Sequence, residues 1–162
     1  MKKEKRNVKV VSRQSKLAQL QVDEVLDQLN YTNKNIEIEK IFLESYGDKN
    51  LDISLMNNPP SDIFTREIDI AILNGDADFS VHSAKDLPYP LNPNLEIVAI
   101  TKRADATDSI VTKDGTKLAD LKQNPIIATS SPTRASEIQK LRKDVIIKSV
   151  RGTIQQRIAQ VD

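Results

Sequence analysis

Cysteine is absent from this sequence, and histidine occurs only once, at His82. Without a thiol the chain can form neither a disulfide bond nor a thiolate metal site, and a lone histidine argues against a zinc site. No apolar run approaches the roughly 20 residues that a membrane-spanning helix needs, and no stretch resembles a signal peptide. We therefore expect a cytoplasmic protein that binds no metal.

The formal net charge of the 162 residues is only +1, but the charges are unevenly distributed. Residues 44–98 carry ten acidic and three basic side chains, a net charge of −7. Residues 126–162 carry three acidic and seven basic side chains, a net charge of +4. A surplus of positive charge of this size, in residues 126–162, suits small carboxylate or phosphate ligands better than a nucleic acid. The basic residues within 1–6 indicate a solvated tail.

The hydrophobic pattern predicts strands and helices in alternation, which favours an α/β fold with parallel sheets. Ser15 and Ser131 occupy N-cap positions, Pro132 follows at a first helical position, and Gly75 ends a helix. The predicted strands span residues 8–11, 36–42, 79–82, 95–100, 109–112, 125–128 and 145–148. Four helices are predicted. The first follows Ser15 and has Ala18, Val22, Val25 and Leu29 on one face, and the second spans residues 64–74. The third follows Ser131, and the fourth begins after Gly152 and continues to Asp162.

Residues 44–62 show neither the hydrophobic period of a helix nor that of a strand, and they contain Gly47, Pro59 and Pro60. A loop of this length is more often a lid than a simple connection, so we expect a mobile lid here. The chain is long enough for one domain or for two small α/β lobes. Because its last predicted helix is unfinished, we expect it to be a piece of a longer protein.

Polar side chains gather directly after four of the predicted strands. In a parallel α/β sheet the carboxyl ends of the strands meet at a crevice where ligands bind. Helix starts there favour an anion, and arginine adds bidentate recognition of carboxylates. We therefore expect one anion-binding site. The four clusters are Arg13-Gln14-Ser15, residues 82–86, Thr129-Ser130-Ser131, and Arg151.

Each of these residues, taken singly, also has a purely structural explanation. Only their order and joint placement along the chain favour a functional one. The structural roles are helix caps for Ser15 and Ser131, solvated helix faces for Arg134 and Arg157, a hydrogen-bonded strand end for His82, and a turn for Asp86.

Four segments carry more specific patterns: SRQSKLA (12–18), IFTREIDIAILNGDADFSVHSAKDLP (63–88), ATSSPTRASEIQKLR (128–142) and KSVRGTIQQRI (148–158). The most specific is His-Ser-x-Lys-Asp-x-Pro at residues 82–88. These segments, their order and their spacing resemble those of the porphobilinogen deaminases, also called hydroxymethylbilane synthases, of tetrapyrrole and haem biosynthesis. The resemblance covers nearly the whole chain.

The resemblance implies two α/β lobes like those of periplasmic binding proteins, joined by hinge strands, and a third small domain. Residues 1–99 would form the first lobe and residues 100–162 the opening part of the second. The resemblance also implies a monomeric transferase that condenses four porphobilinogen units with loss of ammonia. Its dipyrromethane cofactor consists of two linked pyrroles with acetate and propionate groups, so porphobilinogen and oligopyrrole carboxylates would be the partners.

The resemblance assigns the catalytic role to Asp86. Loss of ammonia and the following attack by a pyrrole each produce a cation, which a fixed carboxylate stabilises while it helps to move protons. Cationic and hydroxyl side chains, lining one cleft between the lobes, would hold the carboxylates of the pyrroles. The binding residues so implied are Arg13, Ser15, Ser83, Lys85, Thr129, Ser130, Ser131, Arg134, Arg151 and Arg157.

Three features depart from the family pattern. Thr133 replaces the second arginine of Thr-Ser-Ser-x-Arg-Arg, and the loss of such a contact costs on the order of 2 kcal/mol. Ser61 and Asp62 stand where the family's lid has lysine and glycine, although Tyr46-Gly47-Asp48 is retained. The chain also lacks the third domain and its tethering cysteine, so we expect no covalent dipyrromethane and no activity of this chain alone.

Two other functions stay open on the sequence. An anion-binding module without catalysis fits the lobed fold, but Lys85-Asp86 and the absence of a signal peptide argue against it. A divergent, non-catalytic paralogue fits Thr133 and the altered lid. The remainder of the reading frame would discriminate, because a downstream cysteine-bearing domain favours the deaminase and a stop after Asp162 favours the paralogue.

Overall fold

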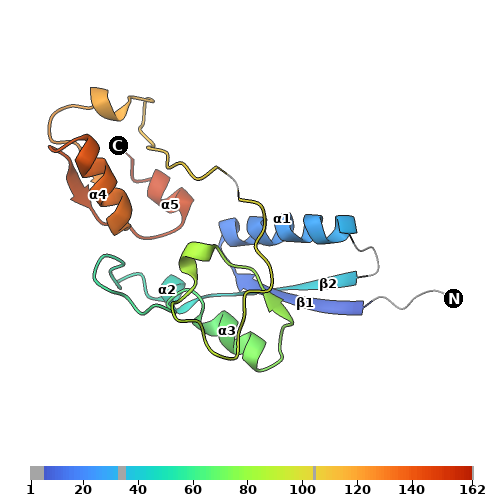
Figure 1. Cartoon of the computed structure of the whole chain (residues 1–162). Coiled ribbons are helices and arrows are strands. Elements are labelled where there is room, and N and C mark those ends of the chain that lie inside the picture. The colour runs from blue at the N-terminus through green and yellow to red at the C-terminus, as the bar shows by residue number, and fades with distance from the viewer. Residues whose placement is uncertain (1–5, 33–35, 104, 162) are drawn as a thin grey trace. The chain divides into compact units, whose positions relative to one another are not determined.

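The computed structural model describes residues 6–32, 36–103 and 105–161. The chain folds as two compact units (Figure 1), each with a parallel sheet of its own. The first unit comprises Met1–Asn50 and Pro60–Lys102, and the second comprises Leu51–Pro59 and Arg103–Asp162. The prediction of an α/β fold with parallel sheets is confirmed.

The first unit is built on a three-stranded sheet in the order β2-β1-β3, with both neighbours parallel to the central strand. Helices α1 and α3 lie on opposite sides of β1 and β2 (Figure 1). The elements are β1 (Arg6–Arg13), α1 (Lys16–Thr32), β2 (Ile36–Leu43), α2 (Tyr46–Lys49), α3 (Arg66–Leu73), β3 (Phe79–Ser80) and a 3₁₀ turn at Ala84–Asp86.

The core of this unit follows from the alternation of side chains along β1. Val10 packs with Val22 and Leu26 of α1 on one face of the sheet. Val11 packs on the other face with Ile68 of α3. Both valines are fully buried, so each face of the central strand has its own helix to cover it.

The strand register brings the polar strand ends of this unit together. Arg13, the last residue of β1, pairs with Leu43, the last residue of β2. Strand β3 ends at Ser80, which pairs with Val11 of β1. The next residue of the chain still lies beside β1, since Ser12 Oγ donates to the Val81 carbonyl at 2.7 Å. The residues that follow β3 are therefore held next to the carboxyl end of β1.

Several predicted elements of this unit need correction. The structureless loop expected at 44–62 contains α2 and a series of turns, and its Ser45 is completely buried. The helix expected at 64–74 spans only Arg66–Leu73. Gly75, two residues beyond its last residue, ends it with a φ of +78°. Strand β3 is shorter than the expected 79–82, because only two of its residues pair with β1.

The buried face of α1 also differs by one position from the prediction. Leu26 is buried in the core, whereas Val25 is half-buried and Leu29 is 38% exposed. The cap is as predicted, since the Ala18 amide donates to Ser15 Oγ at 3.3 Å.

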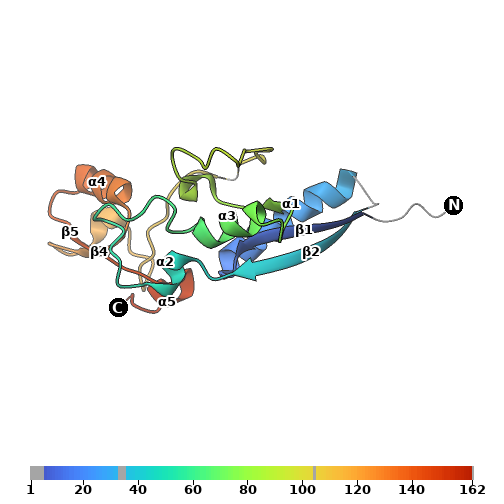
Figure 2. The same cartoon turned by 90° about the horizontal axis from the view of Figure 1, so that it is seen from below.

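The second unit has a two-stranded parallel sheet with short helices around it (Figure 2). Ser131 caps α4 by accepting a hydrogen bond from the Arg134 amide, with Pro132 at the first helical position, as predicted. Thr153 and Gln156 form a capping box at the start of α5. The elements are a 3₁₀ turn at Leu118–Asp120, β4 (Ile126–Ala128), α4 (Pro132–Leu141), β5 (Ile146–Lys148) and α5 (Ile154–Ile158).

Two predicted strands are wrong, and one helix ends early. Residues 95–100 and 109–112 pair with no strand among the described residues, and their apolar side chains are largely exposed, as at Val98 (76%) and Ile100 (87%). The last helix ends at Ile158 instead of continuing to Asp162, which lies outside the described residues. Within the described part of the chain, no helix is both long and apolar enough to cross a membrane.

Candidate functional site

Arg13 occupies the centre of a charged cluster at the carboxyl end of β1. Its Nε and Nη2 donate to the two carboxylate oxygens of Asp48 at 3.0 and 2.5 Å. Its Nη1 reaches Asp86 Oδ2 at 3.4 Å. The guanidinium also lies over the Phe64 ring, with Cζ 4.2 Å from the ring centroid. One arginine thus lies between two carboxylates, and all three charged side chains are at least three-quarters covered.

Asp48 is held in place by its own helix. Ser45 caps α2, donates from Oγ to Asp48 Oδ2 at 2.7 Å, and accepts a hydrogen bond from the Asp48 amide. The Gly47 amide donates to the Ile63 carbonyl at 2.7 Å. Burial alone would raise the pKa of Asp48, but hydrogen bonds from Arg13 and Ser45 outweigh it and lower this pKa. Asp48 is therefore a firmly placed anion.

Asp86 lies on the 3₁₀ turn that follows β3. Its amide donates to the Ser83 carbonyl at 2.9 Å, and its side chain is 17% exposed. The turn places the Asp86 carboxylate 3.4 Å from Arg13 Nη1, at the end of β1. Asp86 is thus both a turn residue and a member of the charged cluster, and its catalytic role stays a prediction.

His82 does not have the hydrogen bond that was predicted for a structural residue. Its Nε2 is buried and has no hydrogen-bond partner among the described residues. Burial lowers the pKa of His82, the charge of Asp86 acts in the opposite direction, and the charge of Arg13 adds to the lowering. The pKa of half-buried His82 therefore lies below its ordinary value and responds to both members of the neighbouring ion pair.

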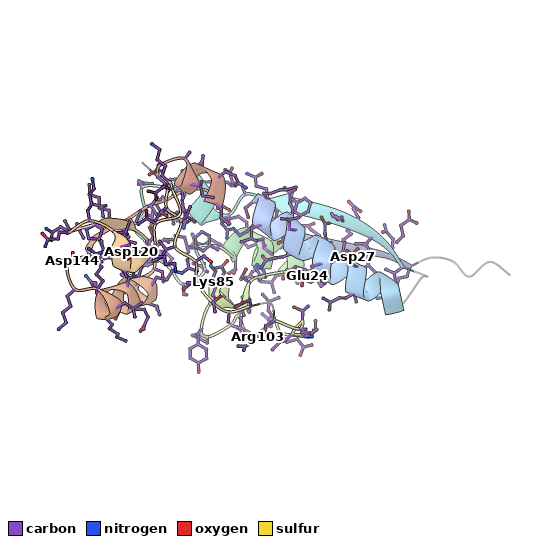
Figure 3. The ribbon with its side chains drawn as sticks, turned by 90° about the horizontal axis from the view of Figure 1, so that it is seen from above. Glu24, Asp27, Lys85, Arg103, Asp120 and Asp144 are labelled. Atoms are coloured by element: carbon purple, nitrogen blue, oxygen red, sulfur yellow. The ribbon has the colours of Figure 1, made fainter. Side chains whose placement is uncertain are left out.

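The other predicted residues of the first unit have different surroundings. Ser15 serves as the cap of α1, and Ser83 exchanges hydrogen bonds with the side-chain amide of Gln21 at 2.9 and 3.2 Å. Lys85, labelled in Figure 3, is exposed on the 3₁₀ turn and makes no ion pair with the described residues.

In the second unit, three hydroxyl residues follow β4. Thr129 Oγ1 accepts from the Ser131 amide at 3.2 Å. Ser130 Oγ accepts from the Val150 amide at 3.0 Å and donates to the Val150 carbonyl. Ser130 therefore joins the ends of β4 and β5, and it would have to exchange a protein partner before it could donate to a carboxylate.

Of the three predicted arginines of this unit, Arg134 lies in the first turn of α4, Arg151 precedes α5, and Arg157 lies in the last turn of α5. Arg134 forms an exposed ion pair with Asp108, with Nη2 2.6 Å from Oδ1. Arg157 Nε donates to the Gly152 carbonyl at 2.9 Å, and Arg151 is half-buried, three residues beyond the end of β5. An exposed pair such as that of Arg134 contributes little free energy, so an incoming carboxylate could replace Asp108.

The structure thus brings Arg13 and Asp86 together in the first unit, and Thr129, Ser130 and Ser131 together in the second. That the two groups line one cleft stays a prediction. The prediction of site residues missed Asp48. The available signal was its place in Tyr46-Gly47-Asp48, just beyond the carboxyl end of β2.

Comparison with known proteins adds an independent observation. Residues 8–162 match the model of the family described as porphobilinogen deaminase, dipyromethane cofactor binding domain. The chain belongs to the porphobilinogen deaminase family. It is 40% identical over 155 residues to the porphobilinogen deaminase of Clostridium botulinum (strain Langeland), a match that covers 96% of this chain and 53% of the relative.

Other clostridial porphobilinogen deaminases give the same result. Those of Clostridium beijerinckii and Clostridium acetobutylicum are each 38% identical over 152 residues, with 94% of this chain and 52% of the relative covered. The chain therefore spans about half the length of the curated relatives that it matches. It contains no cysteine, so it has no thiol to which a pyrrole cofactor could be attached.

Proposed function

We propose that this chain is part of a porphobilinogen deaminase (hydroxymethylbilane synthase) and that it supplies the carboxylate on which the reaction depends. The complete enzyme would condense four porphobilinogen units with loss of ammonia. The observation that carries the proposal is the largely covered Asp86 carboxylate beside Arg13 at the carboxyl end of a parallel sheet. Membership of the family supports it.

The task of Asp86 follows from the charges in the reaction. Loss of ammonia from porphobilinogen leaves a cationic pyrrole, and the attack of a second pyrrole on it yields another cation. A fixed carboxylate beside the pyrrole nitrogens stabilises both cations, and it does so more strongly where the protein excludes water. The 17% exposure of the Asp86 side chain fits this requirement.

Binding of the pyrrole carboxylates would fall to cations and hydroxyl groups. Exposed Lys85 and the replaceable ion pair of Arg134 fit such a role, as do the half-buried Arg151 and Arg157. The same donor set fits a dipyrromethane, which would supply the pyrrole to which the first substrate unit is joined. Arg13, Ser15, Ser83, Thr129, Ser130 and Ser131 complete the proposed binding residues.

The arrangement of the complete protein is also a proposal. We infer two lobes like those of periplasmic binding proteins, with residues 1–99 in the first and residues 100–162 in the opening part of the second. The complete enzyme would be a cytoplasmic monomer, and this chain by itself would be inactive. One observation favours a non-catalytic paralogue as the alternative: Thr133 is exposed in the first turn of α4, where the family pattern has an arginine.

The substitution Asp86→Asn in the full-length protein tests the proposal. Asparagine keeps the size of the side chain but removes its charge, so turnover of porphobilinogen should fall by a factor of about 100 or more, equivalent to roughly 3 kcal/mol in the barrier. The free energy of unfolding should change little. His82→Asn should retain most of the rate. Normal turnover with asparagine at position 86 would show that the carboxylate does not carry the reaction.

A further inference from the structure

The contacts of Arg13 with its two carboxylates are unequal. Asp48 receives two hydrogen bonds, at 3.0 and 2.5 Å, in the parallel arrangement that is strongest for arginine and a carboxylate. Asp86 receives one contact, at 3.4 Å, from the remaining nitrogen. The positive charge of Arg13 is therefore directed mainly to Asp48, and Asp86 is left with the weaker share of it.

We propose that Asp48 is a positioning residue of this site, which holds Arg13 away from close pairing with Asp86 and so keeps the Asp86 carboxylate available to a cationic ligand. The inference rests on the proposed function, because a cation at Asp86 is what that function requires. It assigns a second carboxylate to the reaction, one that acts through Arg13 and touches no reacting atom.

Charge balance explains why a second carboxylate is useful. Arg13 alone beside Asp86 would form a neutral pair, and an incoming cation would meet no net negative charge. With Asp48 present, the three side chains carry a net charge of −1. Asp48 thereby lets Arg13 order the site without cancelling the charge of Asp86.

The contacts around Asp48 indicate that the fold fixes the position of its carboxylate. Ser45, which holds the Asp48 carboxylate, is completely buried. Gly47 leaves no room for a side chain, because an added Cβ would lie 2.6 Å from Cε1 of Phe64, the ring on which Arg13 stacks. The backbone before Asp48 and the ring beneath Arg13 therefore fix each other.

The protein contains its own reporter for a test that needs no substrate. His82 is the only histidine, so its ring gives a single NMR titration, and the charged groups that act on it are Asp86 and Arg13. In Asp48→Asn, Arg13 is uncompensated and moves toward Asp86, and both changes should lower the pKa of His82 further. In an Arg13→Gln background the same substitution should leave this pKa unchanged, because Asp48 acts through Arg13.

A matched control is available in the same unit. Asp62 holds Arg66 with a similar pair of hydrogen bonds, both at 2.8 Å, and Asp62→Asn should not move the His82 titration. Should Asp48→Asn not fold, Asp48→Glu displaces the carboxylate by one methylene and should shift the pKa in the same direction. An unchanged His82 pKa in the folded variant, or an equal shift with and without Arg13, would overturn the inference.

Kinetics of the full-length protein separate this inference from the proposed function. Asp48→Asn should lower kcat by about tenfold with a smaller change in KM, because the effect falls on the charge that stabilises the transition state. Loss of turnover in Asp86→Asn together with a normal kcat in Asp48→Asn would refute the role of Asp48 alone. Normal turnover in both variants would refute the proposed function as well.

Discussion

At the scale of single residues, burial and charge decide what each polar group of the site can do. Arg13 is fixed by Asp48, by Asp86 and by the Phe64 ring, so it is an ordering group more than a free anion receptor. Lys85, which precedes Asp86 on the 3₁₀ turn, has the opposite character, because its side chain is exposed and forms no ion pair with the described residues. The family resemblance made both of them candidate binding residues, and only their contacts distinguish them.

His82, whose Nε2 is buried, should make the stability of the protein depend on pH. Its pKa in the folded state lies below the ordinary 6.5, so below that pH the unfolded chain binds the proton more readily than the folded protein does. The stabilising contribution is therefore complete above pH 6.5 and is lost as the pH falls from 6.5 toward the folded-state pKa. Urea unfolding at pH values on either side of 6.5 measures this change.

A variant without a titrating ring supplies the comparison. His82→Gln should show a smaller loss of the free energy of unfolding over the same pH interval, because glutamine takes up no proton there. If the parent and His82→Gln lose stability equally, the acid sensitivity arises from other groups, and the pKa of His82 is not lowered as its surroundings indicate.

At the scale of elements, the sequence predicted those structures that depend on local pattern. The central strand, the capped starts of α1 and α4, and the glycine end of α3 all follow from residue spacing and cap chemistry. Residues 95–100 and 109–112 have the β-branched residues of strands but no partner strand among the described residues. A pattern records the preference of a segment, whereas pairing depends on a distant segment that the pattern does not contain.

The residues of the candidate site likewise fall into those that the sequence predicted and one that it did not. Arg13 and Asp86 were predicted because strand ends converge in a parallel sheet, and the register of β1 and β3 places them together. Asp48 was missed because residues 44–62 show no period, and the position of α2 depends on the contact of Gly47 with Phe64. That contact joins two segments of the chain, so it could not be read from either one alone.

The short helix α2 should be sensitive to a single methyl group. In Gly47→Ala the new Cβ would lie 2.6 Å from Phe64 Cε1 and 3.0 Å from Ile63 Cγ1, so the ring beneath Arg13 must shift. We expect a loss of about 1–3 kcal/mol in the free energy of unfolding, the usual cost of overpacking. Urea unfolding measures the loss, and the NMR signals of the His82 ring report whether the charged cluster has moved.

Gly75→Ala is the matched control for this substitution. An added Cβ at Gly75 meets no atom within 4 Å, but its φ of +78° is strained for alanine, so this variant should lose about 1 kcal/mol through backbone strain. It should leave the His82 signals in place. A Gly47→Ala protein that is as stable as the parent and has unchanged His82 signals would show that α2 tolerates the added group.

At the scale of the whole molecule, the two units differ in the charge they offer a ligand. The first contains most of residues 44–98, whose net charge is −7, and it holds the Asp48 and Asp86 carboxylates. The second contains residues 126–162, whose net charge is +4, with Arg134, Arg151 and Arg157. Under the proposed function, the carboxylate that stabilises cations would lie in the first unit, whereas the binding of carboxylates would be shared between Lys85 of the first unit and the arginines of the second.

The chain passes between the two units after Asn50, Pro59 and Lys102, and the crossing at Lys102 should be the first place where a protease divides the chain. Residues 96–103 and 105–111 form no helix or strand, and Lys102 and Arg103 are exposed. By contrast, Arg13 and Arg142 are largely covered and engaged in ion pairs. Because proteases need an extended, accessible backbone, the first tryptic cut that leaves two large pieces should follow Lys102 or Arg103.

Mass spectrometry of a brief tryptic digest locates this cut. The matched comparison is Lys102→Gln combined with Arg103→Gln, which removes both tryptic sites from the exposed segment and should make the chain markedly more resistant to division. Lys140 is also exposed, but it lies within α4 and forms an ion pair with Glu137, so its peptide bond should be cut later. A first division within α4, α3 or β1 in the parent would mean that the regular elements open more readily than the connecting segment, and that the boundary between the units does not lie where the chain loses its regular structure.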